Sequence, residues 1–259
     1  MGPRGDADQL PDTHAVAAAL GATWSRLART LRTGWSRERD GVHALVTGAP
    51  IAALNGVWVV RDRADAATVT AALDAVARDG VPFCLQARPA WRDGAAAIAV
   101  ARGMVAEPEI PLMALAGPAR APAAPGLSIR RLETGEARLH CEVAGPAFGA
   151  PAELFAQVVT AEVLGLGEVR AYLGEAGGEP VATAISVAID DAAGIFNVAT
   201  LDHCRRHGYG AAITARAVDD ARRGGASWAW LQSSEAGYGV YQRLGFVTIE
   251  RWPCWASAG

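Results

Sequence analysis

The chain has 259 residues, more than the roughly 100–200 residues of one typical domain, so two domains are expected. Apolar residues make up 51% and charged residues 20%, as in folded globular proteins. The net charge of −3 offers no general attraction to polyanions, although all 24 basic residues are arginine. A nucleic-acid partner is therefore not expected.

Cysteine usage and the termini bear on compartment. Four cysteines lie far apart, without a C-x-x-C pair or a histidine at metal-ligand spacing: Cys84, Cys141, Cys204 and Cys254. Neither a metal site nor a disulfide framework is expected. The chain start lacks the layout of a signal peptide, and no apolar run of about 18 residues could cross a bilayer. We therefore expect a cytoplasmic protein without membrane contact.

Elements of the first domain follow from apolar periodicity and turn residues. In chain order we expect a helix over 16–31, strands over 42–46 and 57–60, a helix over 66–77 capped by Asp65, a strand over 82–87, a helix over 91–101 and an apolar segment at 110–115. Prolines and glycines then interrupt regular structure. We therefore predict a domain at 1–116, a linker at 117–126 and a second domain at 127–259.

The second domain shows a mixed α/β pattern. We expect a strand over 127–132, a helix over 153–164, a hairpin of 169–173 with 181–189, a strand over 195–201, a helix over 208–223, a strand over 227–232, a short helix over 237–244 and a strand over 246–251. With a short helix after the first strand, the order is β-α-α-β-β-β-α-β-α-β. This order predicts a mixed α/β sheet covered by helices.

One strand-to-helix junction has the features of an anion site. The strand over 195–201 leads through a loop to Gly208-Tyr209-Gly210 at the start of a helix. The first amides of a helix lack partners within it and lie at the positive end of its dipole, so they can donate to phosphate oxygens. Arg205, Arg206 and His207 add positive charge and donors. An isolated G-x-G can equally be a plain turn into a helix.

Two motifs together carry a family resemblance. Arg205-x-x-Gly208-x-Gly210 resembles the R/Q-x-x-G-x-G/A signature of the GNAT N-acetyltransferase superfamily, and Tyr241-x-x-x-Gly245-Phe246 resembles its Y-x-x-x-G-F signature at the expected separation. The resemblance covers about residues 127–255. It implies an acyl-CoA cleft where the strand over 195–201 splays away from the strand over 227–232.

The resemblance also implies roles for individual residues. The pantetheine arm of acetyl-CoA would pair with the backbone of the strand, and the helix start would hold its pyrophosphate; the implied cofactor-binding residues are Val198, Ala199, Thr200, Arg205, Arg206, His207, Gly208, Tyr209, Gly210 and Ala211. Tyr241 would protonate the departing thiolate, unless it is only a core tyrosine. Ser234 would lie near the sulfur or, equally, cap the following helix.

The general base departs from the family pattern. The position that often holds glutamate aligns with Gly194, and Asn197 is the nearest inward polar candidate. Asn197 could hold a water or the acceptor amine while Asp190, Asp191 or Glu235 takes the proton, or it could only tie a bend in the strand. No base is assigned, and no metal is expected.

Residues that would choose the acceptor are not identified by the sequence. Trp228 and Trp230 alternate on one face of their strand and could line an acceptor pocket, although paired aromatics on a sheet more often belong to the core. Phe148 lies where relatives often shape acceptor specificity. His203 is an isolated loop histidine that could contact cofactor phosphate.

The first domain looks like a degenerate copy of the second. Where the second has its glycine loop, the first has Arg61-Asp-Arg-Ala-Asp65, with acids that would occupy the helix start and repel phosphate. It also lacks a Y-x-x-x-G-F counterpart. We therefore expect two tandem GNAT-like domains, of which the first is structural or shapes the acceptor site.

The expected function is acetyl transfer from acetyl-CoA to a primary amine of a small molecule or peptide, directly within a ternary complex. We expect a monomer or homodimer. Two alternatives stay open: a transferase using a longer acyl-CoA or an aminoacyl-tRNA donor, and a non-catalytic CoA-binding module.

Overall fold

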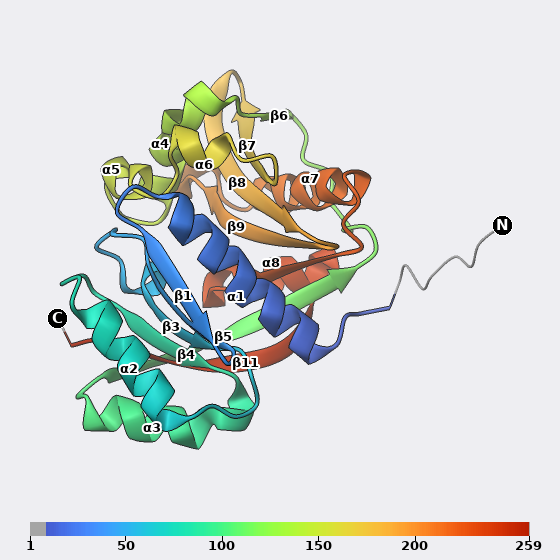
Figure 1. Cartoon of the computed structure of the whole chain (residues 1–259). Coiled ribbons are helices and arrows are strands. Elements are labelled where there is room, and N and C mark those ends of the chain that lie inside the picture. Colours follow the sequence, from blue (N-terminus) through green and yellow to red (C-terminus); the bar gives the residue numbers. More distant parts are fainter. Residues whose placement is uncertain (1–8, 259) are drawn as a thin grey trace. The chain divides into compact units, whose positions relative to one another are not determined.

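The structure is a computed structural model that describes residues 9–258 (Figure 1). Contacts divide the chain into two compact units. Within the described residues, the N-terminal unit consists of Thr13–Leu112 with 249–258, and the C-terminal unit consists of Met113–Thr248 with 9–12. No helix within residues 9–258 is both long and apolar enough to span a membrane.

The N-terminal unit is a sheet with helices on both faces. Its elements are α1 (Thr13–Thr30), β1 (Trp35–Arg39), β2 (Val42–Val46), β3 (Gly56–Val59), α2 (Ala66–Ala77), β4 (Cys84–Ala87), α3 (Arg92–Ala101) and parts of β5 (Val105–Ala116) and β11 (Val247–Ala256). The strands lie in the order β1-β2-β3-β4-β11, with β5 beside β11. Strands β3 and β4 are parallel, joined through α2, whereas β11 runs antiparallel to β4.

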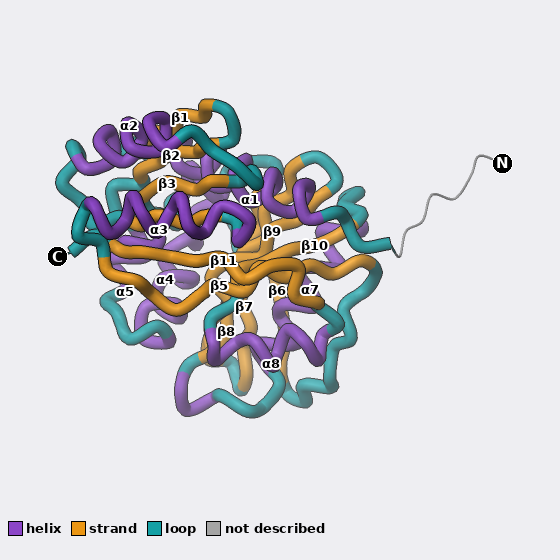
Figure 2. Tube along the Cα trace, turned by 90° about the horizontal axis from the view of Figure 1, so that it is seen from below, coloured by secondary structure: helices purple, strands orange, loops and turns teal. Residues whose placement is uncertain are grey.

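Alternation along these strands assigns the helices to faces. Val57 and Val59 of β3 share a core with Val69 and Leu73 of α2. Trp58, between them, points the other way and stacks on Trp24 of α1 at 6.2 Å. Thus α1 covers one face, while α2 and α3 lie side by side along the other (Figure 2).

The C-terminal unit is a mostly antiparallel sheet. Its elements are β6 (Leu127–Arg131), α4 (Ala137–Ala147), α5 (Ala152–Ala156), α6 (Ala161–Leu164), β7 (Val169–Ala176), β8 (Glu179–Ile189), β9 (Ala192–Thr200), α7 (Tyr209–Arg223), β10 (Trp228–Gln232) and α8 (Glu235–Leu244). The strands lie in the order β10-β9-β8-β7-β6, with the end of β5 beside β10. Strands β9 and β10 are parallel.

Two helix layers cover the faces of this sheet. One core joins α7 to alternate strand residues: Ala182, Ala184, Ala193, Ile195, Ala229 and Leu231. Helix α8 adds Leu244 to the same core. Helix α4 also contacts β8 and β9. Residues between the alternate positions therefore point to the opposite face, the one that α4 covers.

The contact division differs from the predicted domain boundaries at both ends. The change of unit falls between Leu112 and Met113, inside β5, and not at the linker. The last strand returns to the N-terminal unit from Ile249 onward, where Cys254 to Ala256 pair with β4. Open strand edges attract any complementary strand, however distant in sequence. Local composition carries no signal of such an exchange.

The single helix predicted over 153–164 is wrong. It is divided into α5 and α6, and the side chain of Thr160 accepts a hydrogen bond from the amide of Val163 to start α6. Three β-branched residues in a row, Val158 to Thr160, disfavour helix at this point. The helix expected after β6 is α4. Strand β1 was missed because its Trp-Ser-Arg-Glu-Arg sequence is polar, as edge strands often are.

A buried arginine ties the last strand to the N-terminal unit. The side chain of Arg88, at the end of β4, is 3% exposed. Its guanidinium donates to both carboxylate oxygens of Glu250 on β11 and pairs with Asp62 at 2.7 Å. Trp252 donates its indole N–H to the same carboxylate at 2.8 Å. Removing one partner of a buried ion pair leaves a charge without compensation.

We predict that Glu250→Ala lowers the free energy of unfolding by about 1.5–3 kcal/mol, because the buried Arg88 keeps only its ion pair with Asp62 and the Trp252 indole loses its acceptor. Urea denaturation measures the change. Glu109→Ala is the matched control: it removes a partner of Arg92 in an exposed pair and should cost about 1 kcal/mol or less. Equal losses in the two variants would contradict the role of burial.

Candidate functional site

The start of α7 has the backbone geometry of an anion site. Gly208, the N-cap residue, has φ 80°, a left-handed conformation that residues with a side chain adopt only with strain. It offers no side chain to cap the helix. The first helical bond of α7 runs from the amide of Ala212 to the carbonyl of Gly208, at 2.9 Å. The amides of Tyr209, Gly210 and Ala211 precede it and have no acceptor one turn earlier.

Gly210 is needed for packing as well as for access. A Cβ atom at this position would lie 3.2 Å from the hydroxyl oxygen of Thr200, at the end of β9. The absence of a side chain therefore lets the first turn of α7 lie against that strand. This contact brings the end of β9 beside the free amides of α7.

The charged residues of the loop have different positions. The guanidinium of Arg205 donates to the carbonyl of Ala147 at 2.9 Å and pairs with Asp202 at 2.7 Å, so it holds the loop to the end of α4. The Nδ1 atom of His207 contacts the carbonyl of Arg205 at 2.9 Å, and its ring stacks on Tyr209. Arg206 is exposed and has φ 65°.

An extra residue distorts β9. Thr183 of β8 is paired with Ala199, but Ile185 is paired with Phe196. An interval of two residues on β8 therefore lies opposite an interval of three residues on β9. Asn197 lies inside this bulge with φ 48°. A bulge bends its strand and increases the local twist. Asn197 is therefore at the bend, as one of its two sequence interpretations required.

Beyond the bulge, backbone groups alternate between β8 and the other side. The amide of Leu201 donates to the carbonyl of Val181 on β8, so the amide and carbonyl of Ala199 also point toward β8. Those of Val198 and Thr200 point away. Of the three residues predicted to bind pantetheine, only these two turn their backbone groups away from β8, and the carbonyl of Thr200 accepts a hydrogen bond from Nε of Arg205 at 3.4 Å. Ala199 uses its backbone within the sheet.

The pairing of β9 with β10 stops before the bulge. Ala192 to Gly194 pair with Trp228 to Trp230, and β9 continues beyond these pairs to Thr200. The end of the pairing at Gly194 is consistent with the predicted separation of the two strands. The regular pairing of β9 with β10 thus ends three residues before Asn197.

Tyr241 packs within α8. Its ring lies edge-on to Phe246, with ring centroids 6.0 Å apart, and a Cβ atom on Gly237 would come within 2.8 Å of it. Burial raises the pKa of Tyr241 to about 12, so the phenol stays protonated at neutral pH. A hydroxyl in that state can donate a proton.

The remainder of the second motif has a structural reason. Gly245 ends α8 with φ 103°, and the amide of Phe246 donates to the carbonyl of Tyr241. This is a left-handed helix end closed by a hydrogen bond over the last turn. Ser234 caps the start of α8, where its side chain accepts from the amide of Gly237 at 3.2 Å. Of the two roles expected for Ser234, the structure thus shows the helix cap.

Large rings fill the position expected for the base. A Cβ atom on Gly194 would lie 2.6 Å from the Phe196 ring and 2.8 Å from the Trp230 ring. No side chain fits there without repacking. Trp228 and Trp230 are both buried, as the core interpretation of this pair predicted.

The carboxylates considered as proton acceptors are dispersed. Asp190 and Asp191 lie in the turn before β9, and about 20 Å of extended strand separates Asp190 from Asn197. This distance argues against a relay through them. Glu235 is exposed at the start of α8. Phe148, after α4, is 51% exposed and stacks on Phe155, and His203 is exposed in the loop.

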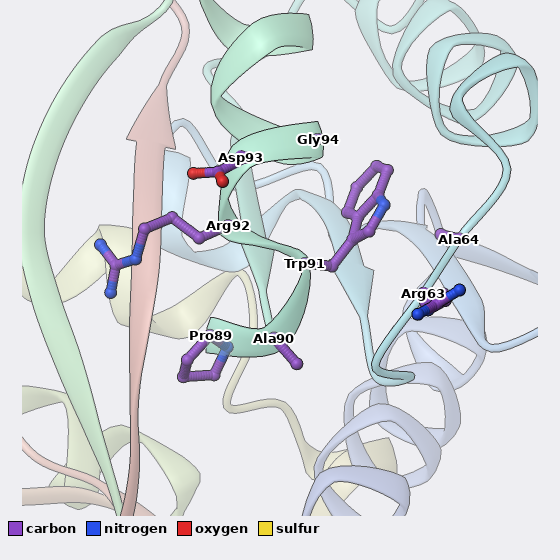
Figure 3. A pocket seen from close by; sticks show the side chains of 8 residues that line it. All are labelled: Arg63, Ala64, Pro89, Ala90, Trp91, Arg92, Asp93 and Gly94. Carbon is purple, nitrogen blue, oxygen red and sulfur yellow. The ribbon is translucent and has the colours of Figure 1, made fainter.

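The N-terminal unit has a cavity of about 500 Å³ where β3 and β4 lead into their helices. In Figure 3 the Trp91 ring lies on the side of the loop that carries Arg63, whereas Arg92 and Asp93 point the opposite way. The loop here lacks the left-handed glycine of the other unit. Instead Asp65 caps α2 by accepting from the amide of Thr68, as predicted. A carboxylate therefore takes the place of an anionic ligand at this helix.

Part of the C-terminal unit matches a known protein family. Residues 145–246 match the profile of the Acetyltransferase (GNAT) family. No curated protein sequence matches significantly. A GCN5-related N-acetyltransferase from Kribbella flavida has a TM-score of 0.70 at 24% identity, covering 97% of both chains.

Two further structures have similar folds at lower identity. A GCN5-related N-acetyltransferase from Sphaerobacter thermophilus has a TM-score of 0.59 at 18% identity, covering 86% of this chain and 75% of its own. A tandem GNAT protein from the clavulanic acid biosynthesis pathway has a TM-score of 0.54 at 18% identity, covering 86% and 81%. The GNAT family signature thus lies in residues 145–246 of the C-terminal unit, and the chain as a whole shares the fold of these solved structures, one of which is a tandem GNAT protein.

Proposed function

We propose that the chain transfers the acetyl group of acetyl-CoA directly to a primary amine of a small molecule or peptide. The observation that carries the proposal is the junction of β9 and α7. There, the free amides of Tyr209 to Ala211 lie beside the strand end at Thr200. A diphosphate fits the first feature and an extended amide-bearing chain fits the second. Coenzyme A has both, in that order.

In this proposal, the residues of the C-terminal unit have separate roles in binding and in proton transfer. The α7 amides would hold the pyrophosphate, with Arg206 as the exposed cation beside them. Val198 and Thr200 would pair with the amides of the pantetheine arm. The amine nitrogen attacks the acetyl carbonyl, the carbon–sulfur bond breaks, and the protonated phenol of Tyr241 donates its proton to the departing sulfur. The proton that the amine loses returns to the phenolate through solvent.

The acceptor class is tested with the full chain and a panel of amines. The panel contains phenethylamine, spermidine, L-lysine, kanamycin and a peptide with a free N-terminal alanine. Release of free thiol from acetyl-CoA reports turnover, and mass spectrometry identifies the acetylated product. Thiol release with at least one amine is expected. If the chain binds acetyl-CoA but acetylates none of the amines, the proposed enzyme activity is wrong and the chain is a CoA-binding module instead.

Gly210→Asp should abolish measurable acetyl-CoA binding. The new carboxylate would stand among the α7 amides and repel phosphate, and its Cβ would crowd Thr200. We expect at least about 100-fold weaker binding by calorimetry, because like charges in contact cost several kcal/mol. The fold should survive, since acids are favourable in a first helical turn.

Gly167→Asp is the control for this variant. It adds the same charge to the same unit at a glycine with open space around it. Its acetyl-CoA affinity should equal that of the wild type, which should titrate to a single site. Unchanged affinity in Gly210→Asp would remove the α7 start from the binding site.

Tyr241→Phe should lower kcat by about 100-fold while leaving the affinity for acetyl-CoA unchanged, because the ring packs and only the hydroxyl donates. The assay is thiol release under conditions where chemistry limits turnover. Tyr238→Phe is the matched control: it lies one turn earlier on α8, and its hydroxyl bonds to Thr248 at 2.9 Å. A wild-type rate in Tyr241→Phe would exclude it as the acid.

A further inference from the structure

A buried histidine of α4 contacts the sheet beside the bulge. His140 is fully buried, and its Nδ1 atom lies 2.5 Å from the hydroxyl oxygen of Thr183 on β8. The same hydroxyl donates to the carbonyl of Tyr172 at 2.8 Å. Sequence analysis gave His140 no role, because no patterned partner lies near it in the chain.

These two hydrogen bonds determine the tautomer of the imidazole. A hydroxyl has one proton, and the Tyr172 carbonyl can only accept, so Thr183 spends its proton there. The hydroxyl oxygen must then accept from His140, which places the imidazole proton on Nδ1. The Nε2 atom carries the lone pair. This arrangement is a neutral histidine held with one nitrogen ready to accept a hydrogen bond.

The accepting nitrogen has no partner within the described residues. Nε2 of His140 is buried and makes no hydrogen bond there. Burial lowers the pKa of His140 to about 3, so the ring stays neutral and does not satisfy Nε2 by protonation. Leaving a buried polar atom without a partner costs free energy. An orphaned acceptor in an acyltransferase domain points to a ligand that carries a donor.

Strand register places this nitrogen on the face of the sheet that carries Gly194 and Trp230. Thr183 is paired with Ala199, directly after the bulge that contains Asn197. Its neighbours Ala182 and Ala184 belong to the core under α7, so Thr183 and His140 lie on the opposite face. Gly194 and Trp230, at the position where the family often has its base, lie on this same face by the same alternation.

We propose that His140 binds the acceptor amine, with its Nε2 atom accepting a hydrogen bond from an amine N–H. This inference rests on the proposed function and adds a residue to it. A neutral primary amine has two N–H bonds and one lone pair, so holding one N–H orients the lone pair for attack on the acetyl carbonyl. His140 thus supplies a hydrogen-bond acceptor from α4 on the face of the sheet where Gly194 has no side chain. It orients the amine and does not store its proton.

Two substitutions separate the nitrogens of the ring. His140→Asn keeps an amide near the position of Nδ1, so it preserves the contact with Thr183 and deletes the Nε2 acceptor. His140→Gln extends an amide to the position of Nε2 and preserves an acceptor there. The matched control is His43→Asn in the N-terminal unit, where a half-buried histidine also contacts a hydroxyl, that of Ser25 at 3.0 Å.

The assay measures KM for the most active amine of the panel, KM for acetyl-CoA, kcat and Tm in the full chain. His140→Asn should raise KM for the amine by about tenfold, the effect of one hydrogen bond, while KM for acetyl-CoA and Tm stay unchanged. His140→Gln should recover part of the amine affinity. His43→Asn should behave as the wild type. A fall in Tm with equal losses in every kinetic parameter would show a structural histidine and overturn the proposal.

Nuclear magnetic resonance tests the contact without turnover. In protein with ¹⁵N-labelled histidine, the long-range proton–nitrogen spectrum should show His140 as the Nδ1–H tautomer, with an Nε2 signal that shifts when the amine is added. An Nε2–H tautomer would overturn the inference while thiol release still supported the proposed function. Absence of turnover by the wild type on every amine would overturn both.

Discussion

The extra residue in β9 is the constraint on which the candidate site of the C-terminal unit depends. A regular strand would continue to pair on both sides and would leave no backbone group for a ligand. Inserting one residue at Asn197 bends β9 after its last pairs with β10 at Gly194. The strand then turns Val198 and Thr200 outward and ends against the first turn of α7. The chain-like and diphosphate-like parts of one ligand can therefore be bound by backbone alone.

Binding by backbone explains which side chains are restricted. Glycine is favoured at 208 by the left-handed conformation and at 210 by the close contact with Thr200, whereas the charge of Arg205 is used within the loop itself. Gly194 is restricted for a different reason, because the rings of Phe196 and Trp230 occupy the space that a side chain would need. A site that binds its ligand through backbone groups allows the surrounding side chains to vary. In the proposal made above for His140, the contact with the acceptor comes from a different element, α4.

The two units contain similar strand-to-helix junctions, but the start of the helix is capped by a side chain in only one of them. In the C-terminal unit the helix start has no side-chain cap and can bind an anion. In the N-terminal unit Asp65 caps α2 from within the chain. The same positive helix end is open to an anionic ligand in one case and is capped by a carboxylate of the protein in the other. The N-terminal unit instead depends on the buried Arg88 and on the last strand, through Glu250.

The sequence by itself determined the elements whose signals are local. Alternation and caps predicted the exact bounds of β2 and α2. Two short motifs pointed to the loop at Gly208 and to Tyr241 as candidate site residues. Such signals work because a turn, a cap or a helix start is decided by neighbours within a few residues. Only the tertiary structure decided that β11 returns to pair with β4, that Ala199 turns its backbone away from the ligand side, and that Thr183 orients His140. These depend on register and on contacts between residues far apart in the chain, where a shift of one residue reverses the face of every side chain.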